Sequence, residues 1–199
     1  MNLCVAVERS PPYDRRIFAT PHSPMSFTLR TATLADLPRL HELFSLPAVY
    51  EFLCDGSPPS KELMEEWVSS VVGAAPPLGL WLLVDAQGDL FGCARLSEAP
   101  AGVATAELTY VLHPDVWGQG LATAMSRSVL ARAFEAPACE SALAGADLPN
   151  AKSIQVMKRL GMRLLRNVEY PAGPGVEYVI KREEITGAPQ GPRVPFFEP

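Results

Sequence analysis

The sequence has no apolar run that approaches the roughly 20 residues needed to cross a bilayer. Its N-terminal region also lacks the apolar stretch of a secretory signal and carries charges such as Glu8, Arg9 and Asp14 instead. From these absences we expect no membrane partner and a cytoplasmic location.

Cysteines are few and are not arranged for metal binding or cross-linking. The four that occur are Cys4, Cys54, Cys93 and Cys139. None belongs to a CxxC pair, and no histidine lies at a ligand-like distance from any of them. This pattern argues against a zinc site or a disulfide framework and favours a reducing compartment, so we expect no metal site.

An excess of positive charge is also missing. The chain has 17 Lys and Arg against 22 Asp and Glu, which gives a net charge of −5. That balance offers no electrostatic reason to expect nucleic acid as a partner. Hydrophobic residues make up 48% of the 199 residues and charged residues 20%, the composition of one ordinary folded domain.

Prolines cluster at the two ends of the chain and divide it into three parts. Residues 1–24 show no periodic pattern and are expected to be a loose extension, with the folded unit beginning at Met25. Residues 25–185 form the expected domain. Residues 186–199 are a tail rich in Pro and Gly, of which we expect only Phe196 and Phe197 to pack.

Within the domain, strand and helix patterns alternate in the order β-α-α-β-β-β-α-β-α-β-β, which predicts an α/β fold. Thr33 with Asp36 resembles a capping box, and Ser60 is an expected N-cap. The expected strands are 27–31, 80–84, 90–96, 105–112, 140–145, 162–169 and 175–182, and the expected helical regions are 34–45, 47–54, 60–72, 120–134 and 150–160.

A glycine-bearing turn between strand 105–112 and the helix after it is the most informative segment. Gly118 and Gly120 allow unusual backbone conformations and leave no side chain in the way of an incoming phosphate. The amides of Gly118, Gln119, Gly120, Leu121, Ala122 and Thr123 can then point at one spot, where the helix N-terminus adds partial positive charge. The turn predicts a pyrophosphate site that needs no Lys or Arg.

Three other interpretations of this turn compete. The first is a simple turn with glycines, an alternative that the local sequence leaves open. A dinucleotide-binding turn would need a third glycine, and Glu140, 20 residues beyond Gly120, would begin a strand rather than end one. A P-loop would need Gly-Lys followed by Ser or Thr, which is missing.

A second motif lies one expected strand further on. Asn150 is a good N-cap, residues such as Ile154 and Met157 form an apolar stripe, and Gly161 is placed to end the helix. Local physics alone explains this segment as an ordinary capped helix.

Together the two motifs resemble the GNAT acetyltransferases, and in particular the RimJ/RimL-like branch. The first is Trp117-Gly118-Gln119-Gly120-Leu121-Ala122-Thr123, with Trp117 where most of the family has Gln or Arg. The second is Asn-x-x-Ser-x-x-Val-x-x-x-Leu-Gly-Met, residues 150–162. The resemblance covers roughly residues 26–183, because Thr28-Leu29-Arg30-Thr31-Ala32 and Asp36 also match the start of the family domain.

The resemblance implies a GNAT fold, with a mixed central sheet of about six to seven strands flanked by four helices. It implies acetyl-CoA as cofactor, held by the turn, by Asn150 on the pantetheine arm, and by Ser153 near the sulfur. The backbone near Val111 and Leu112 would help the oxyanion. The acceptor would be a primary amine, either a small molecule or a protein N-terminus; the oligomeric state, a homodimer included, stays open.

The chemistry needs a base, since primary amines are largely protonated near neutral pH. Glu107 is the expected catalytic base, because the strand Glu107-Leu108-Thr109-Tyr110-Val111-Leu112 resembles the family strand beside the thioester, and Glu169 is a second candidate. Many relatives protonate the thiolate with a Tyr where this chain has Met157, so Ser153 or water would substitute. That missing Tyr leaves a non-catalytic acyl-CoA-binding module as the alternative.

Overall fold

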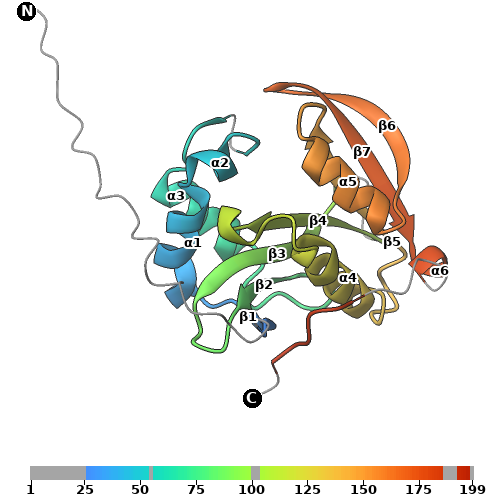
Figure 1. Cartoon of the computed structure of the whole chain (residues 1–199). Coiled ribbons are helices and arrows are strands. Elements are labelled where there is room, and N and C mark those ends of the chain that lie inside the picture. The colour runs from blue at the N-terminus through green and yellow to red at the C-terminus, as the bar shows by residue number, and fades with distance from the viewer. Residues whose placement is uncertain (1–25, 54–55, 100–103, 186–191, 198–199) are drawn as a thin grey trace, which may run out of the picture.

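The computed structural model describes residues 26–53, 56–99, 104–185 and 192–197. Here the chain forms one seven-stranded sheet with α-helices on both faces, which confirms the expected α/β fold (Figure 1). The expected N-terminal extension and the start at Met25 lie outside these residues. The strands are β1 (Thr28–Thr31), β2 (Gly79–Val84), β3 (Leu90–Glu98), β4 (Thr105–Leu112), β5 (Ser141–Asp147), β6 (Arg163–Tyr170) and β7 (Gly173–Lys181).

The helices also follow the expected order. Of the six α-helices in the described residues, two have only four residues each, so four longer ones flank the sheet, as the resemblance implied. Of the predicted helix over 47–54, residues 47–53 are described, and among these only the first four are helical. The six are α1 (Leu37–Phe44), α2 (Pro47–Tyr50), α3 (Lys61–Ser69), α4 (Leu121–Ala133), α5 (Ala151–Arg159) and α6 (Arg182–Ile185).

The sheet splits in its middle. Its strand order is β1-β2-β3-β4-β5-β7-β6, and β4 and β5 are its one parallel pair in the described chain. That pair has only three residue partners, of which the last is Glu107 with Leu143. Because β4 continues to Leu112 and β5 to Asp147, the two strands separate beyond this point. We call the resulting gap between β4 and β5 the splay.

Two hydrophobic cores cover the two faces of the sheet. On one face, α1 and α3 pack against the sheet with residues such as Leu40, Val68 and Val111. On the other face, α4 and α5 do so with residues such as Met125 and Met157. Strand β2 is buried along its whole length because both faces are covered, as its continuous apolar run predicts.

The local signals for the helix starts are confirmed. The N–H and Oγ1 of Thr33 donate to Asp36 Oδ2 over 2.9 and 3.0 Å. Ser60 Oγ accepts from the backbone three residues on at 3.1 Å and so caps α3. No helix of the described residues is long and apolar enough to cross a membrane.

The end of the chain packs through its backbone and through Val194 and Phe196, whereas the side chain of Phe197, also expected to pack, is 59% exposed. The Leu29 amide of β1 donates to the Pro195 carbonyl over 2.8 Å, and the Leu29 carbonyl accepts from the Phe197 amide over 2.7 Å. Buried Val194 adds its carbonyl as the acceptor for Ser128 Oγ of α4, at 2.7 Å. Residues 192–197 therefore cover the outer edge of β1, whose other edge pairs with β2, and so protect an edge that would otherwise be unpaired.

Candidate active site

The hydrogen bonds at both ends of the β3–β4 ladder show which β4 groups face the splay. The Ala99 amide donates to the Thr105 carbonyl over 3.1 Å, and the His113 amide donates to the Phe91 carbonyl over 2.8 Å. In an antiparallel pair such bonds alternate along the strand. Odd-numbered residues of β4 therefore bond to β3, and even-numbered residues direct their backbone groups toward β5.

This alternation separates the two predicted oxyanion positions. The amides of Tyr110 and Leu112 face the splay, whereas the amide of Val111 faces β3, where Val111 pairs with Cys93. The Leu112 carbonyl is already used, since it accepts from Trp117 Nε1 at 2.8 Å. Leu112, and with it Tyr110, can thus present an N–H group to a carbonyl oxygen in the splay, and Val111 cannot.

The predicted phosphate turn has the backbone that its glycines suggested. Gly118 and Gly120 have φ angles of +78° and +77°, and an added Cβ at either would meet nothing within 4 Å. The first helical bond of α4 runs from the Ala124 amide to the Gly120 carbonyl over 3.0 Å. The amides before Ala124, those of Leu121, Ala122 and Thr123, have no acceptor within the helix. The turn therefore offers an open cradle of N–H groups, which fits a pyrophosphate.

Side chains around the turn add to this cradle. Gln119 is exposed, and its side-chain amide donates to the Asp115 carbonyl at 3.4 Å. Thr123 is buried, and its Oγ1 has no hydrogen-bond partner in the part of the chain that is described. Lys152 of α5 places its Nζ 4.3 Å from the ring centroid of Trp117. A lysine thus stands beside a turn for which the sequence predicted no basic residue.

Helix α5 brings its N-terminal residues to β4. Asn150 caps the helix, because its Oδ1 accepts from the Ser153 amide over 3.1 Å. The Ser153 hydroxyl lies 2.7 Å from the phenol oxygen of Tyr110, which also donates to the Ser153 carbonyl over 3.0 Å. Burial raises the pKa of Tyr110 to about 12, so the phenol stays protonated. The two predicted α5 residues and Tyr110 therefore meet.

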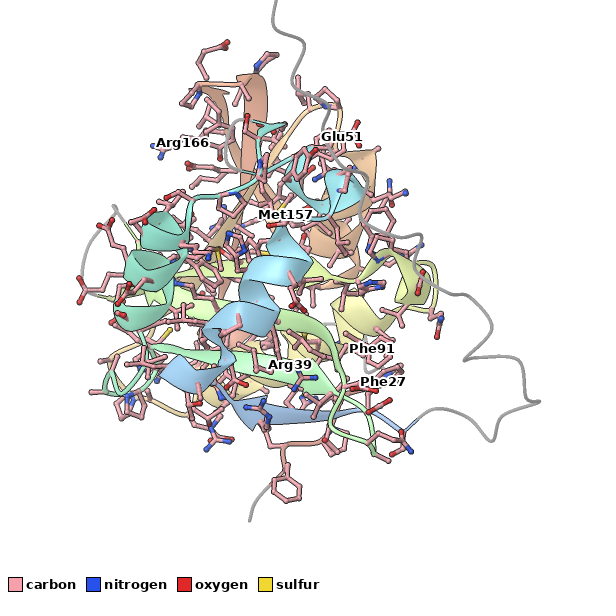
Figure 2. All side chains as sticks on the ribbon, turned by 90° about the vertical axis from the view of Figure 1, so that its left-hand side faces the viewer. Phe27, Arg39, Glu51, Phe91, Met157 and Arg166 are labelled. Atoms are coloured by element: carbon pink, nitrogen blue, oxygen red, sulfur yellow. The ribbon has the colours of Figure 1, made fainter. Side chains whose placement is uncertain are left out.

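Met157 lies one helical turn beyond Ser153, on the same side of α5, because residues four apart share a helix face. Its side chain is fully buried in the core that α4 and α5 form with the sheet, and in Figure 2 it lies near the middle of the view, below Arg166 and Glu51. The position where many relatives have a tyrosine is thus occupied by Met157, which is part of the hydrophobic core. The hydroxyl-bearing neighbour of Ser153 comes from β4 instead.

Glu107 lies at the last β4–β5 pair, on the face of the sheet opposite to α4 and α5. Burial raises the pKa of its carboxyl, the charge of Arg95 lowers it, and the charge of Glu177 raises it. Arg95 is held in place by Ser97 and Ser70, whose hydroxyls lie 3.0 and 2.9 Å from its guanidinium nitrogens. A carboxyl whose pKa is raised by partial burial is suited to accept a proton near neutral pH.

Glu169, the second predicted base, lies elsewhere. It pairs with Pro174 on the outer β6–β7 hairpin, is exposed, and alternates with Tyr170, so the two side chains point to opposite faces. Sequence reasoning did not single out Tyr110, which is hydrogen-bonded to Ser153, or Lys152, which lies beside Trp117. In the sequence, Tyr110 fits the apolar pattern of its strand, and a lysine on a helix is usually solvent-exposed. Neither residue type therefore indicated a functional contact.

A sheet split at one parallel pair, with an open amide cradle at a helix N-terminus and a half-buried carboxylate at the split, defines an acyl-transfer domain. The family profile described as acetyltransferase (GNAT) domain matches residues 26–163. The chain therefore belongs to the GNAT acetyltransferase family. Within the described residues, no group of His, Cys, Asp and Glu is placed to hold a metal ion.

Solved structures share this fold. The aminoglycoside acetyltransferase AAC(6')-Ib, crystallised with coenzyme A, is 21% identical, with a TM-score of 0.70 over 83% of this chain and 100% of its own. The spermidine N-acetyltransferase of Vibrio cholerae, crystallised with CoA and spermine, is 18% identical, with a TM-score of 0.68 over 81% and 98%. A GNAT-family acetyltransferase from Bacillus anthracis is 20% identical, with a TM-score of 0.67 over 80% and 96%.

Proposed function

We propose that this protein transfers the acetyl group of acetyl-CoA to a primary amine, by direct attack in a ternary complex. The observation that carries the proposal is the position of Glu107. Its half-buried carboxyl lies where β4 and β5 separate, near the start of the strand whose other end leads to the glycine turn. Donor and base would thus meet at the splay from opposite faces of the sheet. The two motifs favour the RimJ/RimL-like branch within the family.

The donor side would use the turn and the start of α5. The amides of residues 118–123 would bind the pyrophosphate, with Lys152 adding a positive charge beside Trp117. The cap on α5 uses only the amide oxygen of Asn150, so its NH₂ group remains for the pantetheine arm. When bound, acetyl-CoA supplies a thioester that an amine can attack.

On the acceptor side, Glu107 would take the proton that the amine loses as its nitrogen bonds to the carbonyl carbon. The amides of Leu112 and Tyr110 would donate to the carbonyl oxygen. The carbon–sulfur bond then breaks, and the thiolate takes a proton from solvent. For the Ser153 hydroxyl to donate a hydrogen bond to the sulfur, the single phenol proton of Tyr110 would turn from the Ser153 carbonyl to the Ser153 Oγ, 2.7 Å away.

The acceptor is proposed as a class only. Solved neighbours were crystallised with ribostamycin, kanamycin or spermine, all compounds with several amines. We therefore propose an acceptor panel that begins with small polyamines and aminoglycosides and also contains a peptide with a free N-terminus.

The test compares Glu107→Gln with Glu169→Gln. We expect the first variant to lower turnover about 100- to 10,000-fold, because a general base is removed, and to leave CoA affinity unchanged. The second variant, on the opposite face, should keep wild-type turnover. Thiol release from acetyl-CoA in the presence of each panel amine measures the rate, and calorimetry measures CoA binding. Loss of activity in the second variant alone would assign the base to Glu169.

Two other outcomes would remove the proposal. If the wild-type protein binds CoA but releases no thiol with any amine of the panel, it is an acyl-CoA-binding module. If CoA does not bind at all, the turn has another role.

A further inference from the structure

Tyr170, the last residue of β6, lies across two neighbouring strands on a path that glycines keep open. Its ring occupies the space where a Cβ on Gly175 of β7 would be, and its hydroxyl occupies that space at Gly145 of β5. Gly175 is buried beneath the ring, whereas Gly145 is exposed around the hydroxyl. Any larger residue at either glycine would push the Tyr170 side chain away.

The face on which Tyr170 lies follows from the alternation along the strands. The α4–α5 core contains the side chains of Ala144 and Ala146 of β5 and of Val176 of β7. Side chains alternate along a strand, so Gly145, between the two alanines, and Gly175, next to Val176, face the other side of the sheet. Side chains of odd-numbered β4 residues share that second face, as Val111 shows by packing with α1 and α3.

Gly145 lies two residues beyond Leu143 on β5, and Leu143 with Glu107 forms the last pair of the β4–β5 ladder. The Tyr170 hydroxyl therefore lies over the β5 side of the splay, just past the point where the ladder ends. The Glu107 carboxyl lies on the β4 side of the same opening.

We propose that the Tyr170 hydroxyl binds the acceptor amine opposite Glu107 and so sets its position for attack. This role rests on the proposed function. The phenol oxygen would accept a hydrogen bond from one amine N–H while Glu107 accepts from another, which leaves the nitrogen lone pair to face the thioester. On this proposal, the glycines on β5 and β7 are needed because only a residue without a Cβ leaves room for the Tyr170 side chain to cross these two strands.

The charges around the phenol fit this role. Burial raises the pKa of Tyr170, and the charges of Glu177, Glu107 and Asp147 raise it further. A protonated phenol can donate its O–H to a neighbouring carboxylate and still accept a hydrogen bond from an incoming N–H with an oxygen lone pair. The ion pair of Arg166 with Glu177, 2.8 Å between Nε and Oε2, balances part of this negative charge.

The experiment uses Tyr170→Phe, Gly145→Ala and the double variant, assayed with acetyl-CoA and whichever of spermine, kanamycin or an N-terminal peptide the wild type acetylates fastest. We expect each single change to raise the KM for that amine about five- to tenfold, because one hydrogen bond is lost. The double variant should be no worse than either single one, since Gly145→Ala acts only by displacing the hydroxyl. CoA affinity should stay unchanged in all three.

Tyr178→Phe is the matched control, because Tyr178 lies on β7 but points into the α4–α5 core. It should leave the KM for the amine unchanged. A wild-type KM in Tyr170→Phe, or additive effects in the double variant, would overturn the inference. If Glu107→Gln still lowers turnover as expected in that case, the acetyltransferase assignment stands and only the role proposed for Tyr170 is wrong. Gly145→Ala is expected to fold, since its methyl group would clash only with the Tyr170 side chain, while the backbone atom nearest to it, the Val176 carbonyl oxygen, is at an ordinary contact distance of 3.7 Å.

Discussion

An alanine at Gly120 should weaken CoA binding more than it weakens the fold. Gly120 has a φ of +77°, which costs a residue with a Cβ about 1 kcal/mol or slightly more. Since nothing lies within 4 Å of the added methyl group, the protein itself should meet no clash. The methyl group would instead stand in the cradle and block at least one charge-assisted bond of about 1.5–3 kcal/mol. We therefore expect CoA affinity to fall by about 10- to 100-fold.

Gly73→Ala is the control for this change. Gly73 follows α3, has the same φ of +77°, and also has nothing within 4 Å of an added Cβ. Both variants should lose about 2–4 °C of melting temperature per kcal/mol of strain, but only Gly120→Ala should lose CoA in isothermal titration calorimetry. Equal CoA affinity in the two variants would refute the assignment of the turn as the pyrophosphate site.

Two further predictions follow from the charges. Arg95 lowers the pKa of Glu107, so Arg95→Met should move the acid limb of the pH dependence of kcat/KM to higher pH; an unmoved limb would mean that Glu107 is not the titrating base. Asp36, bound to Arg30 over 2.5 and 2.9 Å, has a pKa of about 2 instead of 3.8. Its stabilisation is therefore present above its ordinary pKa and is lost as pH falls from about 4 towards 2. In urea unfolding, Asp36→Asn should cost about 1–2 kcal/mol at neutral pH, whereas Asp89→Asn, in an exposed pair at 3.8 Å, should cost less than about 0.5 kcal/mol. Equal costs would contradict the idea that the geometry at Asp36 matters.

Most of the fold could be predicted because its signals are local. The apolar run of β2, the caps at Ser60 and Asn150, and the positive φ at Gly161 each depend on neighbours within a few residues. Helix α6 was missed because four residues carry no apolar periodicity. Its first residue, Arg182, is held by carbonyls before β5, among them that of Ala136, which lie 43 to 46 positions away in sequence.

The site could be predicted only where its parts are continuous in sequence. The turn at 118–123 is one segment, so its glycines were enough to suggest an anion site. The two base candidates show the limit of this reasoning. In the sequence, Glu107 and Glu169 each lie near one end of an expected strand, and nothing distinguishes them. Only the pairing of the strands places Glu107 at the splay and Glu169 on the exposed outer hairpin.

The sequence by itself determined the order of strands and helices, the helix caps and the glycine turn, because backbone conformation and apolar periodicity act over short stretches of chain. The tertiary structure alone decided where β4 and β5 part. It also joined Tyr110 to Ser153, 43 residues apart, and laid Tyr170 over Gly145. Such contacts depend on which strands pair and in what register, and those are set by the packing of the whole sheet between its two layers of helices.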